Sequence, residues 1–260
     1  MGGAEHMKLM ESMIVAFSMY SKIPMPQIEW NKENMRYALC FFPVVGIAVG
    51  ALVFLWEGLS GLLPFGRVFD TAVYLLIPVL VTGGIHLDGL LDTSDALSSW
   101  QTKERRLEIL KDSHAGAFAI IICCTYYLAA FGIWSEVERE GAAVLAAGFV
   151  LSRAFSGLGI ATFRCAKNSG LAATFANGAD KKRSRIVLFA ELILAACLMI
   201  VIQPFLGILA VGAACLVFFA CRRMSYKKFG GITGDTQGFF LQMCELAMAL
   251  AVVIGDNIWF

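Results

Sequence analysis

Residues 37–56, YALCFFPVVGIAVGALVFLW, contain no charged side chain. A helix of about 20 apolar residues, rising 1.5 Å per residue, crosses the roughly 30 Å hydrocarbon core of a bilayer. Lipid offers the backbone no hydrogen-bond partner, so such a stretch must satisfy its own N–H and C=O groups. The stretch Tyr37–Leu59 is therefore predicted to be a transmembrane helix.

Six further stretches have the same apolar character. None shows the alternation of apolar and polar residues that is typical of barrel strands. The sequence therefore predicts an all-α fold, a polytopic membrane helical bundle with about seven transmembrane helices. The six stretches are Thr71–Leu87, Gly116–Trp134, Ala142–Phe163, Ile186–Ile202, Pro204–Cys221 and Gly238–Ile258.

The N-terminal region differs from these stretches. Leu9–Tyr20 is apolar but too short to cross, and Pro24 and Pro26 follow it, so it is predicted to be an interfacial or re-entrant helix. Residues 1–6 are typical of an artificial N-terminal addition and are set aside. Residues 7–260 are expected to form a single integral membrane domain.

The composition supports a membrane protein and excludes other classes. Hydrophobic residues make up 58% of the chain and charged residues only 16%, whereas soluble proteins have about a quarter charged. The formal net charge of +1 gives no reason to expect a nucleic-acid partner. The 8 cysteines are scattered without a CxxC pair, so neither disulfides nor a zinc site are expected. The lipid bilayer is the expected surrounding, and a homo-oligomer is left open.

The basic residues predict the orientation of the bundle. Of the 21 Lys and Arg, only Arg67 and Arg139 lie on one side of the predicted spans, and Arg153 lies within one. All the others lie on the opposite side. Because cytoplasmic loops carry the excess of Lys and Arg, that side is expected to face the cytoplasm across the cell (inner) membrane.

Three acids follow the second predicted span in the segment HLDGLLDTSDA, residues 86–96. On a helix, Asp88, Asp92 and Asp95 at i, i+4 and i+7 fall within an arc of about 60°. Carboxylates this close repel one another unless a cation lies between them, and Mg²⁺ held by a few carboxylates and substrate phosphates is a common solution. The bland alternative is a solvated helix end.

A second motif, KDSHAG, precedes the third predicted span. It would bring a further carboxylate, Asp112, and the imidazole of His114 to the same membrane face. An ordinary interfacial histidine is the alternative for His114.

A third motif, FGGITGDTQG at residues 229–238, precedes the last predicted span. Its glycines allow close approach of the backbone to a ligand, and the following helix start favours anions. Gly231, Gly234, Asp235 and Thr236 are therefore candidates for binding phosphate groups, with a flexible turn as the alternative.

Arg153 lies within a predicted span, where a charge facing lipid costs several kcal/mol. It is interpreted either as a partner of substrate phosphate, which is the favoured hypothesis, or as the partner of Glu245 in a structural ion pair.

At these motifs the chain resembles the cobalamin (5′-phosphate) synthase family, the adenosylcobinamide-GDP ribazoletransferases. The segments HLDGLLDTSDA, KDSHAGAFA and FGGITGDTQGFF carry the resemblance, which extends over the chain from about Met7. It implies a transfer of α-ribazole or α-ribazole 5′-phosphate to adenosylcobinamide-GDP, giving adenosylcobalamin or its 5′-phosphate and releasing GMP.

The resemblance also implies roles for the candidate residues. Asp88, Asp92 and Asp95 would hold Mg²⁺, and Asp112 would be a further ligand or the general base. Asp88, Asp92, Asp112 and His114 are the expected catalytic residues. The substrate-binding residues are expected to be His86, Arg153, Gly231, Gly234, Asp235 and Thr236.

Three other functions compete with this one. A CDP-alcohol phosphotransferase or a prenyltransferase also cleaves a diphosphate with aspartates on a helical bundle, but neither the DxxDGxxAR nor the NDxxD motif is present. A transporter would account for charges inside the spans. It would not explain why acids and glycines gather at one membrane face.

Overall fold

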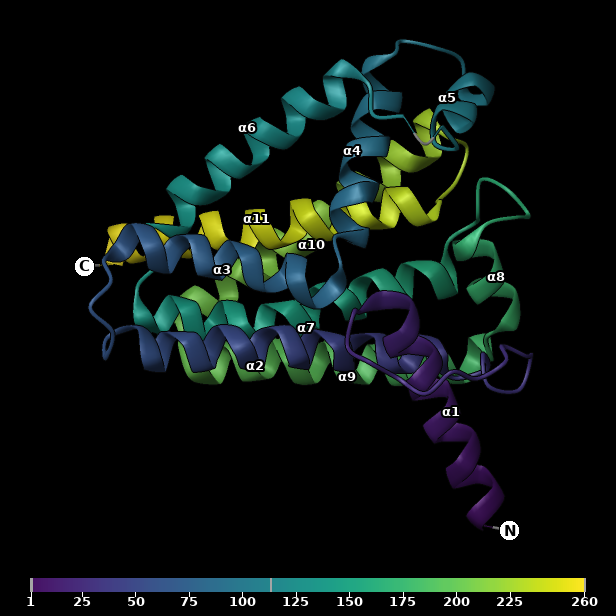
Figure 1. Ribbon diagram of the computed structural model, residues 1–260, viewed down its shortest axis with the longest axis horizontal. Helices are drawn as coiled ribbons and strands as arrows, with labels where there is room; N and C mark the ends of the chain where they lie inside the picture. The colour runs from purple at the N-terminus through teal and green to yellow at the C-terminus, as the bar shows by residue number, and fades with distance from the viewer. Residues whose placement is uncertain (1, 113, 260) are drawn as a thin grey trace.

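The computed structural model describes residues 2–112 and 114–259, and within them the chain is α-helical with no named strand (Figure 1). This confirms the all-α prediction. The elements are α1 (Gly2–Tyr20), the 3₁₀ helix η1 (Ala38–Phe41), α2 (Phe42–Ser60), α3 (Arg67–Thr82), α4 (Ile85–Ser98), α5 (Lys103–Ile109), α6 (Ala117–Trp134), α7 (Arg139–Thr162), α8 (Leu171–Gly178), α9 (Lys181–Ile202), α10 (Pro204–Lys228) and α11 (Gly234–Trp259).

Six helices in the described residues are long and apolar enough to cross a membrane, and a bent helix pair raises the number to seven. The six are η1 with α2, α6, α7, α9, α10 and α11. The pair is α3 and α4, which meet at an angle of 95°. The structure therefore supports a multi-pass membrane protein with the predicted number of spans.

The bend between α3 and α4 is the main difference from the predicted spans. Gly83 and Gly84 have φ of 66° and 79°, a left-handed conformation that glycine adopts without steric cost. The helix expected to continue to Leu87 instead ends at Thr82, and α4 turns across the bundle. The side chain of Lys22 packs against Gly83, and the N–H of Lys22 donates to the Val81 carbonyl at 2.7 Å.

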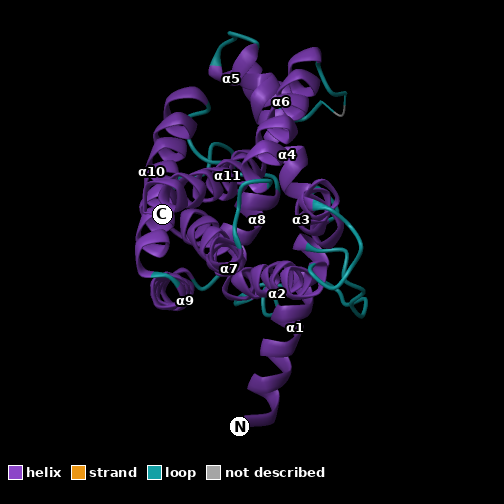
Figure 2. Cartoon of the chain, turned by 90° about the vertical axis from the view of Figure 1, so that its left-hand side faces the viewer, coloured by secondary structure: helices purple, strands orange, loops and turns teal. Residues whose placement is uncertain are grey.

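Helix α7 occupies the centre of the bundle, between α2, α9, α10 and α11 (Figure 2). Most of its residues are buried. Its contact with α2 is close because Gly46 and Gly50 of α2 lie directly against the carbonyls of Phe149 and Ala146. Small residues at helix contacts let backbones approach in this way within membranes.

The two ends of the bundle differ. We call the end where α7 and α10 finish and α9 and α11 begin the site end, and the opposite one the far end. At the site end, α1 projects from the body and buries Val15 and Ala16 at its inner end (Figure 1). The expected helix Leu9–Tyr20 lies within α1, which begins at Gly2, so residues 2–6 are helical too.

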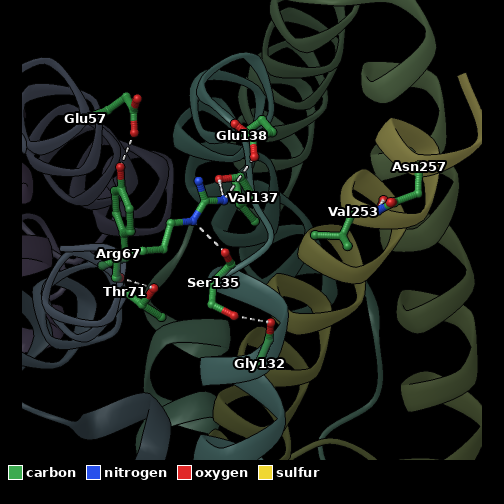
Figure 3. Close-up of polar contacts among 10 residues, drawn as sticks. Glu57, Arg67, Thr71, Gly132, Ser135, Val137, Glu138, Val253 and Asn257 are labelled. Carbon is green, nitrogen blue, oxygen red and sulfur yellow. Dashed lines mark hydrogen bonds and ion pairs between the residues drawn. The ribbon is translucent and has the colours of Figure 1, made fainter. Parts of the chain in front are cut away.

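At the far end, Arg67 ties the start of α3 to the turn between α6 and α7 (Figure 3). Its guanidinium donates to the carbonyls of Ser135 at 2.6 Å and Val137 at 2.9 Å, and it forms an ion pair with Glu138 at 3.3 Å. Arg67, one of the two basic residues that the sequence assigned to this side, thus links neighbouring helices through hydrogen bonds and an ion pair.

Candidate active site

The three acids predicted to share a helical face lie on one helix, α4. Asp88 is exposed, while Asp92 and Asp95 are half-buried. The charges of Asp88 and Asp95, and also of Asp235 on α11, act on the carboxyl of Asp92. Asp88 and Asp235 also line one cavity of about 110 Å³, so the structure brings carboxyl groups of α4 and α11 together at the site end.

Two glycines allow α4 and α11 to cross at this point. A Cβ placed on Gly89 would lie 2.7 Å from the Asp235 carbonyl oxygen and 3.0 Å from the Cα of Gly238. A Cβ on Gly238 would lie 2.9 Å from the His86 carbonyl oxygen. Contacts this short leave no room for a side chain, so both positions require glycine. Sequence reasoning did not assign either of them, although both stand inside the quoted motifs.

The segment before α6 reaches the same group of acids through Asp95, whose carboxylate lies directly against Gly116. A few residues earlier, Asp112 accepts a hydrogen bond from the His114 N–H at 3.0 Å, and its Oδ1 lies 2.8 Å from Nδ1 of His114. These bonds hold the pKa of Asp112 below its usual range. Both side chains are exposed, and their contact is with each other rather than with the acids of α4.

The glycine-rich segment, residues 229–238, is held in place by contacts with the backbone of residues 164–166. Gly230 has φ of 82°, and Gly231 lies so close to the 164–166 backbone that a Cβ would come within 2.5 Å of the Arg164 carbonyl oxygen. The N–H of Ile232 donates to the Arg164 carbonyl at 2.9 Å, and the N–H of Ala166 donates to the Ile232 carbonyl at 2.8 Å. The segment expected to be a flexible turn or a phosphate loop is thus fixed to the loop after α7.

The start of α11 is capped by a reciprocal pair of threonines. The N–H of Thr233 donates to Thr236 Oγ1 at 2.8 Å, and the N–H of Thr236 donates to Thr233 Oγ1 at 3.1 Å. Such reciprocal bonds satisfy N–H groups that have no partner at a helix start. Thr236 is fully buried, so its hydroxyl serves the cap, while Gly234 and Asp235 line cavities.

Arg153 and His86 lie deeper in the bundle. Arg153 is 1% exposed and pairs with Glu245 at 2.7 Å, and it also donates to the Phe149 carbonyl at 3.0 Å. The ion pair that the structural interpretation of Arg153 predicts is therefore present. His86 is buried against Tyr20 and Phe42, and together with Arg153 it lines a cavity of about 30 Å³.

The donor set of the site suits a hard cation, because its side chains offer carboxylate oxygens. Within residues 2–112 and 114–259, no three His, Cys, Asp or Glu side chains converge tightly enough to hold a metal ion by themselves. Mg²⁺ in proteins is commonly held by one or two carboxylates, with waters and substrate phosphates completing its shell. The arrangement fits that incomplete form of site.

These features define a class of protein: a polytopic α-helical membrane protein with acidic and glycine-rich segments at one end of its bundle. The sequence profile of cobalamin-5-phosphate synthases matches residues 12–253. The chain belongs to the cobalamin-5-phosphate synthase family.

Curated relatives share almost the whole chain. An adenosylcobinamide-GDP ribazoletransferase of Lachnoclostridium phytofermentans is 45% identical over 252 residues, which cover 97% of each chain. That of Clostridium botulinum is 32% identical over 240 residues, covering 92% of this chain and 95% of the relative. The adenosylcobinamide-GDP ribazoletransferase of Desulfitobacterium hafniense is 32% identical over 250 residues, covering 94% of this chain and 97% of the relative. No solved structure matches the chain. The predicted family is confirmed.

Proposed function

We propose that this chain is an adenosylcobinamide-GDP ribazoletransferase that depends on Mg²⁺. It joins adenosylcobinamide-GDP to α-ribazole or α-ribazole 5′-phosphate and releases GMP. The observation that carries the proposal is the gathering of Asp88, Asp92, Asp95 and Asp235 where α4 crosses α11. The relatives, which match along nearly the full chain and bear this name, support the choice of substrates.

The reaction is a displacement at phosphorus. A ribazole hydroxyl oxygen bonds to the phosphorus attached to cobinamide, the bond from that phosphorus to the bridging oxygen breaks, and GMP leaves with the electron pair. Phosphoryl transfer of this kind depends on positioning and on compensation of negative charge. Mg²⁺, when bound, supplies that compensation on the diphosphate. Asp88, Asp92 and Asp95 would hold it.

The proton of the attacking hydroxyl needs an acceptor. The Asp112–His114 pair has the geometry of a base held by a carboxylate, with 2.8 Å between Asp112 Oδ1 and His114 Nδ1. We assign proton transfer to this pair. Asp112 then orients His114, and its alternative role as a cation ligand is set aside because its carboxylate is engaged by the N–H and the ring of His114.

The site end carries the basic loops, so we place it at the cytoplasmic face of the cell membrane. Substrates with phosphate groups are then drawn from the cytoplasm. Arg153 is left out of the substrate site, because its ion pair and burial favour the structural role.

The test is incubation of purified protein in detergent with adenosylcobinamide-GDP, α-ribazole 5′-phosphate and Mg²⁺. We expect GMP and a corrinoid containing the ribazole in equal amounts. Uptake or counterflow of a corrinoid by protein in liposomes, with no GMP formed, would instead make the chain a transporter.

A further inference from the structure

A second cavity adjoins the acids and has a different charge. It has a volume of about 340 Å³ and lies between the end of α5, the loop between α7 and α8, and the start of α11. Its volume falls in the range of small-molecule sites, about 300–1,000 Å³. Its polar lining comprises Lys111, Lys167, Ser169, Thr233 and Asp235.

The two lysines contribute more positive charge than the lining neutralises. Lys167 is half-buried and lines the cavity, and its ammonium group donates to the Leu107 carbonyl of α5. The charges that act on it are those of Lys111, Asp235 and Glu108. Lys111 is exposed, and no ion pair in the described part of the chain holds it. Two ammonium groups facing one cavity repel each other, and an anion between them relieves that repulsion.

Backbone groups favour the same kind of ligand. The first turns of α8 and α11 both line the cavity, through Ala172, Ala173 and Gly234. The start of α8 carries no side-chain cap, so its leading N–H groups lack partners within the helix and attract anions, whereas at α11 the N–H of Thr236 is already bound by Thr233. The hydroxyl of Ser169 stands at the same wall as a neutral donor, whereas that of Thr233 donates to Asp235 at 3.3 Å.

The cavity also touches the acidic site. Gly234 and Asp235 form part of its wall and, on their other side, part of the wall of a smaller cavity of about 110 Å³ that Asp88 lines. A ligand in the lysine cavity would therefore lie next to the group of acids that we assign to the diphosphate.

We propose that the lysine cavity binds a phosphate monoester of one of the reactants through Lys111 and Lys167. This rests on the proposed function, which offers two sources of the same chemistry: the guanylate that leaves, and the 5′-phosphate of α-ribazole 5′-phosphate. In the second case, the cavity distinguishes the phosphorylated acceptor from free α-ribazole.

The experiment compares Lys111→Met with Lys103→Met, which removes an exposed lysine of α5 outside the cavity. Turnover is measured with α-ribazole and with α-ribazole 5′-phosphate, and inhibition by GMP is measured with each. Lys167→Met is a second variant, with thermal unfolding in detergent as its check, because Lys167 also contacts α5.

For Lys111→Met we expect a loss of about tenfold or more in one of two readouts. A loss of kcat/KM confined to α-ribazole 5′-phosphate assigns the cavity to the acceptor. Weaker GMP inhibition, with both acceptors affected alike, assigns it to the leaving guanylate. Lys103→Met should resemble the unchanged protein, and Lys111→Arg should recover much of the loss.

Unchanged kinetics and GMP inhibition in both Lys111→Met and a folded Lys167→Met would overturn the cavity proposal while the transferase function stands. If the unchanged protein shows no turnover, the proposed function fails instead. The cavity is then decided by equilibrium dialysis with labelled inorganic phosphate and GMP. If the unchanged protein retains phosphate or GMP and Lys111→Met retains less of it, the cavity is an anion site. If the unchanged protein retains neither, the cavity proposal is wrong.

Discussion

At the scale of single residues, the site depends on carboxylates that α4 and α11 bring to one end of the bundle. The sequence could predict that Asp88, Asp92 and Asp95 share a helical face, because that follows from spacing alone. It could not predict that Asp235 would join them, because that contact depends on how two distant helices cross. For Arg153 the sequence favoured the phosphate role over the ion pair with Glu245, but burial does not separate the two roles, since both place the guanidinium away from lipid.

We expect Asp88→Asn and Asp92→Asn each to lower turnover by about a hundredfold or more, because each removes a charge from the proposed Mg²⁺ site without changing side-chain shape. GMP release is the measurement, and thermal unfolding checks the fold. Glu136→Gln, an exposed acid at the far end, is the matched control and should remain active. Full activity in the presence of EDTA would contradict the cation assignment.

The Arg153–Glu245 pair predicts a loss of stability rather than of substrate binding. Arg153→Met leaves the Glu245 carboxylate, 10% exposed, without its partner, and breaking a buried pair costs about 3 kcal/mol or more. The double change Arg153→Met with Glu245→Gln should recover much of that loss. Unfolding in detergent micelles measures this. If the two changes have additive effects on the free energy of unfolding, and Arg153→Lys also uses adenosylcobinamide-GDP less well, Arg153 binds substrate phosphate instead.

At the scale of elements, the helix bounds were largely predictable because hydrophobic length determines them. The break at Gly83–Gly84 was not predictable from the sequence, because glycine is common inside transmembrane helices. The positive φ of these two glycines is required only by the tertiary contacts of the chain. That break sends α4 across α11. The crossing is the element on which the acidic site depends, and two glycines determine how close it is.

Gly89→Ala should therefore impair activity. Its Cβ would lie 2.7 Å from the Asp235 carbonyl oxygen, so α4 must move away from α11. We expect turnover to fall by about tenfold or more, because small misplacements of reacting groups have large effects. Gly132→Ala on α6, where a Cβ meets nothing within 4 Å, is the control. Equal activity of the two variants would show that the close crossing is unimportant.

At the scale of the whole molecule, the distribution of basic residues predicted which loops share an end, and the structure brings those loops together through Gly116, Asp95, Gly89 and Asp235. What the sequence could not supply is the three-dimensional path of α6, because a uniformly apolar helix has no face that indicates its neighbours.

Labelling tests the orientation. In a Cys165→Ser background, Lys103→Cys should react with an impermeant thiol reagent from the cytoplasmic side and Glu136→Cys from the opposite side. Both positions are exposed and lie at opposite ends of the bundle. Lys182→Cys serves as the positive control for the cytoplasmic side. Labelling of Lys103→Cys only from outside would reverse the orientation.

The course of α6 has a consequence for the surrounding lipid. This helix runs diagonally away from the bundle (Figure 1), and only 17% of its residues are buried, so most of its apolar surface is left for lipid to cover. Its 18 residues reach about 27 Å, slightly less than a typical hydrocarbon core even before tilt is counted. A hydrophobic mismatch is therefore expected at α6. Gly116, the residue just before this helix, lies against the carboxylate of Asp95.

A thick bilayer should draw α6 upright and loosen that contact. We expect turnover in liposomes to decline as lipid acyl chains lengthen, with the thermal unfolding temperature changing little. Turnover that is indifferent to chain length would mean that the protein, rather than the membrane, fixes the tilt of α6.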